Sequence, residues 1–169
     1  MQFVLALAPG VGKAQISCYL KPEVQLQVVE DATYDALGAA DVAIVSSGTA
    51  TVEAALMDTP MIVIYRLAPV TAAIARWLVR TPMFAMVNLI AGKRIVPELV
   101  QKEFTPDRVA NEVIKLLDSP EARSEMRSGL ASVREKLGPP GAVERAADII
   151  SGMLVNHGAK GEPDMTKHG

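Results

Sequence analysis

The residues best suited to hold a ligand lie together in segment 46–53, which reads Ser-Ser-Gly-Thr-Ala-Thr-Val-Glu. The hydroxyl side chains of Ser47, Thr49 and Thr51 surround Gly48, and a short apolar run precedes them. A loop that leads from a parallel strand into a helix presents free N–H groups, and a glycine there lets the backbone approach a ligand. We therefore predict that this loop binds phosphate.

Glu53 lies one helical turn after Thr49 on the same predicted helix face. A glutamate near a helix start often completes a capping box, but this needs Ser or Thr three residues earlier, where Ala50 stands. The remaining structural benefit is the helix-dipole interaction of about 0.3 to 1 kcal/mol. We predict that Glu53 accepts hydrogen bonds from sugar or ribose hydroxyls, with plain helix capping as the alternative.

Four more polar residues are weaker candidates. Arg66 follows the apolar run 61–65 and suits a pyrophosphate, although an exposed arginine at a strand end is commoner. Asn88 stands at a predicted strand end and suits either a sugar hydroxyl or an Asx-turn, of which the turn is favoured. Glu98 and Gln101 have the spacing of adjacent helical turns, which is typical of a solvated helix face.

The elements that must position these residues alternate between strands and helices. Apolar and alternating runs predict strands at 3–8, 24–29, 42–45 and 61–65, with a fifth candidate at 84–87. Helical stretches at 13–20, 34–39 and 49–57 lie between the first four. This order predicts right-handed βαβ units and a parallel sheet covered on both faces. The fold class is therefore α/β, with a Rossmann-like sheet.

The C-terminal third is predicted to be helical. Thr105-Pro106 and Ser119-Pro120 each supply an N-cap followed by proline at the first helical position, which predicts helices to Leu117 and to about Leu137. The Gly-Pro-Pro-Gly sequence at 138–141 breaks the chain before a last helix at 142–154. We expect one domain over residues 1–155 and a disordered tail over 156–169.

Composition excludes several classes of function. A net charge of −2 provides no basic field, so nucleic acid is not an expected partner. Cys18 is the single cysteine, and the two histidines, His157 and His168, lie near the end, so no zinc cluster is expected. No apolar run reaches the roughly 18 residues of a membrane span. No catalytic residue is assigned, because no general base with a tuning partner is visible.

A further helix is predicted at 70–79, in the most apolar and cationic stretch of the chain. Arg76, Trp77 and Arg80 flank its apolar residues and could meet a membrane surface. Core packing is the favoured alternative.

Several motifs together resemble the C-terminal domain of the lipid-A-disaccharide synthases, over about residues 27–154. They are Ser-Gly-Thr-Ala-Thr-Val-Glu-Ala-Ala-Leu at 47–56, Thr-Pro-Met at 59–61, Tyr-Arg at 65–66, Asn-Leu-Ile-Ala-Gly at 88–92, Val-Pro-Glu-Leu-Val-Gln at 96–101 and Gly-Pro-Pro-Gly-Ala at 138–142. The family has two Rossmann-like halves of the glycosyltransferase-B type and uses no metal or other cofactor.

The resemblance implies a hexosyltransferase of lipid A biosynthesis in Gram-negative bacteria. It would transfer 2,3-diacylglucosamine from its UDP derivative to 2,3-diacylglucosamine 1-phosphate, forming a β-1,6 bond and releasing UDP. This chain would bind the donor: Ser47, Gly48 and Thr49 at the pyrophosphate, Glu53 at the ribose, and Asn88, Glu98 and Gln101 around the donor sugar. The general base and the acceptor site would belong to the N-terminal half, so the chain alone is expected to be inactive.

The chain also departs from the family pattern. The family opens this domain with a strand and a Leu-Pro-Gly-Ser-Arg type loop, and the chain has no such motif, so the sheet is expected to lack an element. Two alternatives remain open: a non-catalytic fragment or oligomerisation module that binds no nucleotide, and another UDP-N-acetylglucosamine-type transferase or epimerase domain. The implied location is cytoplasmic, peripheral on the inner face of the inner membrane, and a homo-oligomer is compatible with the sequence.

Overall fold

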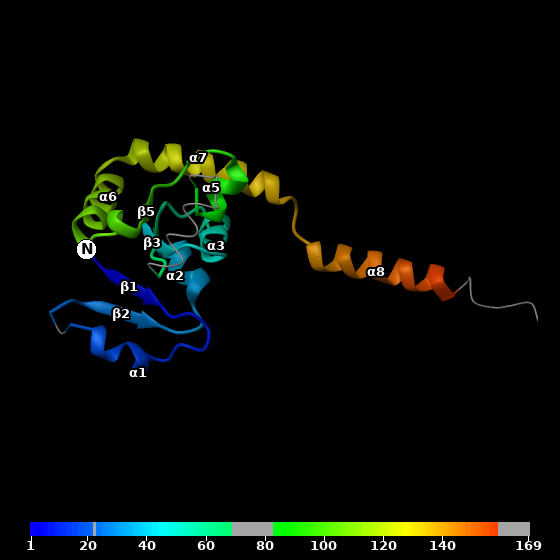
Figure 1. Ribbon diagram of the computed structural model, residues 1–169, viewed down its shortest axis with the longest axis horizontal. Coiled ribbons are helices and arrows are strands. Elements are labelled where there is room, and N and C mark those ends of the chain that lie inside the picture. Colours follow the sequence, from blue (N-terminus) through cyan, green and yellow to red (C-terminus); the bar gives the residue numbers. More distant parts are fainter. Residues whose placement is uncertain (22, 69–82, 159–169) are drawn as a thin grey trace, which may run out of the picture. The chain divides into compact units, whose positions relative to one another are not determined.

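The centre of the fold is β4 (Met61–Tyr65), whose first three side chains are fully buried in the computed structural model. The structure describes residues 1–21, 23–68 and 83–158. β3 (Ala43–Ser46) and β5 (Glu98–Val100), which are labelled in Figure 1, pair with β4 on either side, and both run parallel to it. The β-branched side chains of Ile62 and Val63 suit a central strand covered on both faces.

A second, two-stranded parallel sheet is formed by β1 (Phe3–Ala6) and β2 (Leu26–Val29), with Phe3 opposite Leu26. The predicted α/β class with parallel strands is confirmed, but the strands are divided between two sheets where one was expected. Phe3 and Val4 are nearly half exposed, whereas the side chains that begin β4 are fully buried. The main core therefore belongs to the three-stranded sheet.

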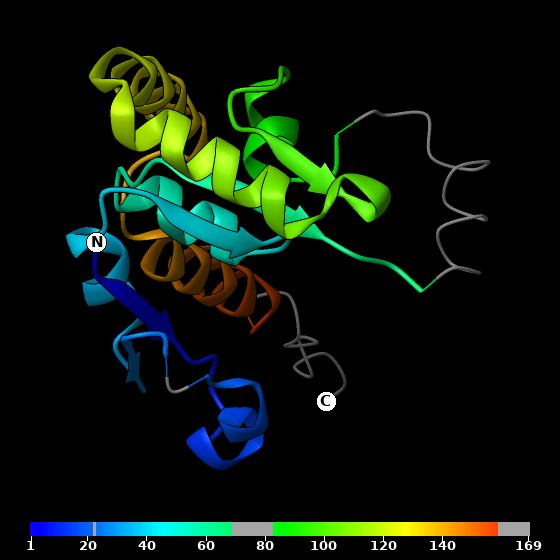
Figure 2. The same ribbon diagram turned by 90° about the vertical axis from the view of Figure 1, so that its left-hand side faces the viewer.

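Helices alternate with these strands and follow them along the chain. Their bounds are α1 (Lys13–Ile16), the 3₁₀ turn η1 (Ser17–Tyr19), α2 (Thr33–Ala39), α3 (Ala50–Leu56), α5 (Met86–Ala91), the 3₁₀ turn η2 (Gln101–Glu103), α6 (Pro106–Asp118), α7 (Pro120–Leu137) and α8 (Ala142–Gly158). Figure 2 shows α3 and α6 on opposite faces of the three-stranded sheet. Ala54 and Ala55 of α3 and Leu116 of α6 belong to one core cluster with β4.

The start signals predicted for two of these helices are confirmed. The hydroxyl of Thr105 accepts a hydrogen bond from the Arg108 N–H at 3.4 Å, and proline follows it as the first residue of α6. The Ser119 hydroxyl accepts from the Ala122 N–H at 3.1 Å in the same way at the start of α7. Local capping chemistry thus determined both boundaries.

α7 ties the three-stranded sheet to its covering helices. Met126, Leu130 and Val133 lie along one face of α7 and are buried. Cationic side chains of α7 donate to carbonyl oxygens in the last turns of three other helices: Arg123 to α6, Arg134 to α3 and Lys136 to α5. Positive charge at these positions complements the helix dipoles.

The predicted strand at 84–87 is wrong. Only Phe84 and Ala85 are extended or irregular there, and α5 begins at Met86. A short apolar run cannot be assigned to strand or buried helix from periodicity alone. The usable signal lay downstream, because Gly92 ends α5 in the left-handed conformation with φ of 76°.

Residues Leu137–Gly169 form a second compact unit. Its helix α8 continues past the predicted end at Leu154 to Gly158. Val143, Met153 and Leu154 are exposed on α8. The predicted helix at 70–79 and most of the predicted tail lie outside the described residues.

Candidate functional site

Three loops meet at the carboxyl edge of the three-stranded sheet. Ser47 follows β3, Arg66 follows β4 and Gln101 follows β5, and the three strands are parallel neighbours. In an open parallel sheet, ligands bind at this edge. The structure therefore brings together three candidate residues that are far apart in the sequence.

The loop at 46–49 turns sharply into α3. Gly48 has φ of 144°, a conformation that residues with a side chain rarely adopt, and a Cβ added there would meet no atom within 4 Å. Thr49 is exposed and occupies the N-cap position just before α3. Within the part of the chain that the structure describes, the N–H groups of Gly48, Thr49 and Ala50 have no hydrogen-bond acceptor. These three donors are available to a ligand.

We expect Gly48→Ala to destabilise the domain by about 1 to 3 kcal/mol, because the added side chain strains this backbone conformation without a steric clash. Urea unfolding measures the change. Gly12→Ala is the matched control, since a Cβ there also meets nothing within 4 Å but φ is an ordinary −92°. Equal stability of the two variants would contradict the assigned loop conformation.

The hydroxyls of Ser47 and Thr51 are already used within the fold. Ser47 donates from its N–H to the Ile64 carbonyl and from Oγ to the Phe84 carbonyl, both at 3.0 Å. Thr51 is fully buried, and its Oγ1 donates to the Gly48 carbonyl at 2.8 Å. A hydroxyl has a single hydrogen to donate. In this structure, the hydroxyl hydrogens of Ser47 and Thr51 bind backbone carbonyls of the fold and are not donated to a phosphate.

Asn88 lies at the centre of a buried hydrogen-bond network, and the prediction that it stands at a strand end is wrong. It is in α5 and fully buried. Its Nδ2 donates to the Val96 carbonyl at 3.0 Å and to Glu98 Oε1 at 2.6 Å, and its Oδ1 accepts from the N–H groups of Ile95 and Val96. These four bonds fill the hydrogen-bonding capacity of the amide.

Glu98 is the second member of this network, and its predicted place on a solvated helix face is also wrong. It opens β5 and is 5% exposed. Its Oε2 accepts from the Phe84 N–H at 2.8 Å, and its Oε1 accepts from the Ala85 N–H at 3.0 Å as well as from Asn88. The carboxylate therefore caps the start of α5, where a negative charge is favoured.

The side chains of Arg66 and Gln101 are held by hydrogen bonds at the carboxyl edge of the three-stranded sheet. The Arg66 guanidinium donates to the Phe104 carbonyl at 3.1 Å and lies 5.0 Å from the centre of the Phe104 ring. Gln101 lies in η2, not on a helix face, with φ of 56°, and its Nε2 donates to the Leu67 carbonyl at 3.3 Å. Phe104 was not singled out from the sequence, because no motif marks an aromatic residue as the platform for a distant arginine.

Glu53 is the carboxylate of α3 and lies in its first turn, close in sequence to Gly48. It is partly exposed, and its N–H donates to the Thr49 carbonyl at 3.1 Å, one turn earlier. Thr49 occupies the N-cap position without a side-chain cap hydrogen bond. The predicted absence of a capping box at this helix start is confirmed.

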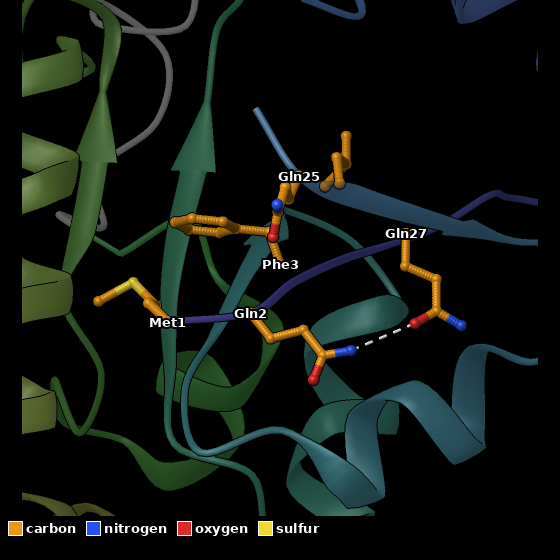
Figure 3. A pocket seen from close by; sticks show the side chains of 6 residues that line it. Met1, Gln2, Phe3, Gln25 and Gln27 are labelled. Atoms are coloured by element: carbon orange, nitrogen blue, oxygen red, sulfur yellow. Dashed lines mark hydrogen bonds between the residues drawn. The ribbon is translucent and has the colours of Figure 1, made fainter. Parts of the chain in front are cut away.

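A separate hollow lies elsewhere in the described residues. It measures about 470 Å³ and is lined by Met1, Gln2, Phe3, Gln25, Leu26 and Gln27 (Figure 3). Figure 3 also shows the Gln2 amide donating to Gln27 Oε1, at 3.3 Å. These residues stand at the amino ends of β1 and β2. Open parallel sheets bind ligands at the carboxyl edge, so the loops after β3, β4 and β5 are better placed for a ligand than this hollow.

Two other expectations concern metals and membranes. Among residues 1–21, 23–68 and 83–158, no group of three or more His, Cys, Asp or Glu side chains could hold a metal ion. No helix in the same part of the chain is long and apolar enough to cross a bilayer. Arg76, Trp77 and Arg80 lie outside the described residues.

Comparison with known proteins identifies the family. A family model described as lipid-A-disaccharide synthetase matches residues 2–151. The chain is 43% identical over 155 residues to a lipid-A-disaccharide synthase of Anaeromyxobacter dehalogenans, covering 90% of this chain and 40% of the relative. The corresponding protein of Geobacter metallireducens is 41% identical over 91% of this chain and 40% of its own length. The chain thus spans about 40% of the length of these curated relatives. The match covers most of the chain, including every candidate residue at the sheet edge, and the chain therefore belongs to the lipid-A-disaccharide synthetase family.

Proposed function

We propose that this chain is the donor-binding part of a glycosyltransferase of lipid A biosynthesis. The complete enzyme transfers 2,3-diacylglucosamine from its UDP derivative to 2,3-diacylglucosamine 1-phosphate, forming a β-1,6 bond and releasing UDP. The observation that carries the proposal is the meeting of the loops after β3, β4 and β5 at one sheet edge, in a chain that matches the family over residues 2–151. An edge of this kind suits a nucleotide.

The free donors at this edge suggest how the nucleotide is held. The N–H groups of Gly48 and Thr49, with the exposed Thr49 hydroxyl, face the pyrophosphate, and Arg66 adds a positive charge beside it. Glu53 accepts hydrogen bonds from the ribose hydroxyls, and Gln101 lies towards the donor sugar. Ser47, Thr51, Asn88 and Glu98 support these groups through the internal hydrogen bonds described above.

The other partners follow from the proposed reaction. The lipid acceptor and the general base are supplied by the remainder of the enzyme, which corresponds to the part of the relatives that this chain does not match. Because donor and acceptor both carry acyl chains, the complete enzyme works at the cytoplasmic face of the inner membrane. Arg76, Trp77 and Arg80 provide basic and aromatic side chains for contact with that surface.

Calorimetric titration with UDP tests the proposal. We expect the chain to bind UDP, and Glu53→Ala to weaken the binding by roughly 10- to 100-fold, as for the loss of hydrogen bonds to a charged group. Glu125→Ala, at an exposed position on α7, is the control and should bind as the unaltered chain does.

Each remaining outcome has a definite meaning. Absence of binding heat at any UDP concentration would favour the non-catalytic module that binds no nucleotide. Tighter binding of UDP-N-acetylglucosamine than of UDP-2,3-diacylglucosamine would favour a transferase or epimerase with other substrates.

A further inference from the structure

Glu98 is a buried carboxylate that has no direct part in the proposed contacts with nucleotide. At 5% exposure, with three donors already bound to its two oxygens, it has little capacity left for a sugar hydroxyl. Burying a carboxylate is costly unless it is well hydrogen-bonded. We therefore looked to the protein groups that Glu98 contacts, and not to a ligand, for the role of this carboxylate.

The peptide group between Phe84 and Ala85 links Glu98 to the glycine loop. The N–H of this peptide is that of Ala85, which donates to Glu98 Oε1 at 3.0 Å. The C=O of the same peptide is that of Phe84, which accepts from Ser47 Oγ at 3.0 Å. A trans peptide is planar, and its N–H and C=O point in opposite directions. By holding the N–H, Glu98 thus directs the carbonyl towards Ser47.

Asn88 holds the carboxylate in place. Its Nδ2 reaches Glu98 Oε1 at 2.6 Å, while its Oδ1 is fixed by the backbone of Ile95 and Val96 just before β5. The connection therefore runs from Asn88 through Glu98 and the Phe84–Ala85 peptide to Ser47. Every step is a hydrogen bond in a part-buried or buried setting.

Ser47 passes this restraint to the loop that carries the free donors. Its own N–H is bound to Ile64 of β4 and its hydroxyl to Phe84, so Ser47 is held from both sides. The next two residues, Gly48 and Thr49, carry N–H groups without an acceptor among the described residues. The direction of these two N–H groups thus depends on how Ser47 is fixed.

We infer that Glu98, held by Asn88, is a positioning residue that orients the phosphate-binding donors of Gly48 and Thr49 through the Phe84–Ala85 peptide and Ser47. This role rests on the proposed function for its link to UDP. The orientation of the loop itself can be measured without any ligand.

The test is Glu98→Gln in the full chain. The glutamine amide keeps one oxygen but places an N–H₂ group against N–H donors of the backbone, so the Phe84–Ala85 peptide loses part of its restraint. We expect amide hydrogen exchange at Ser47 and Thr51 to accelerate about fivefold or more, and UDP affinity to fall about tenfold, in protein that remains folded. Exchange in α6, which lies outside the network, should not change.

Two further variants strengthen the test. Glu125→Gln makes the same chemical change at an exposed position of α7 and should alter neither readout. If Glu98 only stabilised the fold, its replacement would accelerate amide exchange throughout the domain. If Glu98→Gln does not fold, Glu98→Asp, which keeps the charge but shortens the reach, takes its place.

The outcomes separate this inference from the proposed function. Unchanged exchange at Ser47 and Thr51 in a folded Glu98 variant would overturn the positioning role, whether or not UDP binds. If the unaltered chain binds no UDP, the proposed function fails, and faster exchange confined to the loop in the variant would still support the positioning of the loop by Glu98.

Discussion

Asn88→Ala is expected to lower the free energy of unfolding by roughly 3 to 5 kcal/mol, a large share of the stability of a small domain. Asn88 is fully buried, and all four of its hydrogen bonds are made within the protein. Alanine can replace none of them. The substitution would leave the N–H and the carbonyl of Val96 buried, and the N–H of Ile95 part-buried, without these partners, and Glu98 would lose one donor.

Urea unfolding followed by circular dichroism measures this change. Asn111→Ala on α6 is the matched control, because Asn111 is exposed, and we expect its effect to stay within about 0.5 kcal/mol. A loss of less than about 1 kcal/mol for Asn88→Ala would show that the network does not form in solution as described.

The second large effect concerns catalysis. We expect this chain alone to form the disaccharide at least about a million-fold more slowly than a complete relative, because we propose that the acceptor site and the general base belong to the remainder of the enzyme. At the sheet edge, Glu98 accepts three internal hydrogen bonds, and Glu53 is proposed to bind the ribose. On this proposal, neither carboxylate takes a proton from the acceptor hydroxyl.

Radiolabelled UDP-2,3-diacylglucosamine and the acceptor lipid provide the assay. The Anaeromyxobacter dehalogenans synthase, of which this chain matches 40%, serves as the positive control. Turnover by the chain alone at a rate near that of the relative would show that the base and the acceptor site lie within these 169 residues. The division of functions proposed above would then be wrong.

The sequence was most informative where local chemistry decides the structure. Proline after an N-capping Thr or Ser fixed the starts of α6 and α7, and the run of apolar residues at Met61–Tyr65 fixed β4. The motif at 46–53 was rightly placed between a strand and a helix. These features depend on neighbouring residues alone, so they can be predicted without a tertiary structure.

The part of the site after β4 was harder to predict. Phe84 to Val87 is apolar and short, and this pattern fits a strand as well as the start of a buried helix. Glu98 and Gln101 were assigned to a helix face from their spacing, yet Glu98 begins β5 and Gln101 follows its last residue. A three-residue strand carries too little periodicity to outweigh polar residues at both of its ends.

The sequence by itself determined the α/β class, the family resemblance and the glycine loop at the end of β3, because each depends on short motifs whose residues are neighbours in the chain. Only the tertiary structure decided that Asn88 and Glu98 face each other across 2.6 Å and that Glu98 reaches the Phe84–Ala85 peptide. It also decided that this peptide meets Ser47, which lies 37 positions away in the chain. The physical reason is that a buried amide or carboxylate must find its partners in space, and no spacing along the chain encodes which distant backbone groups will satisfy it.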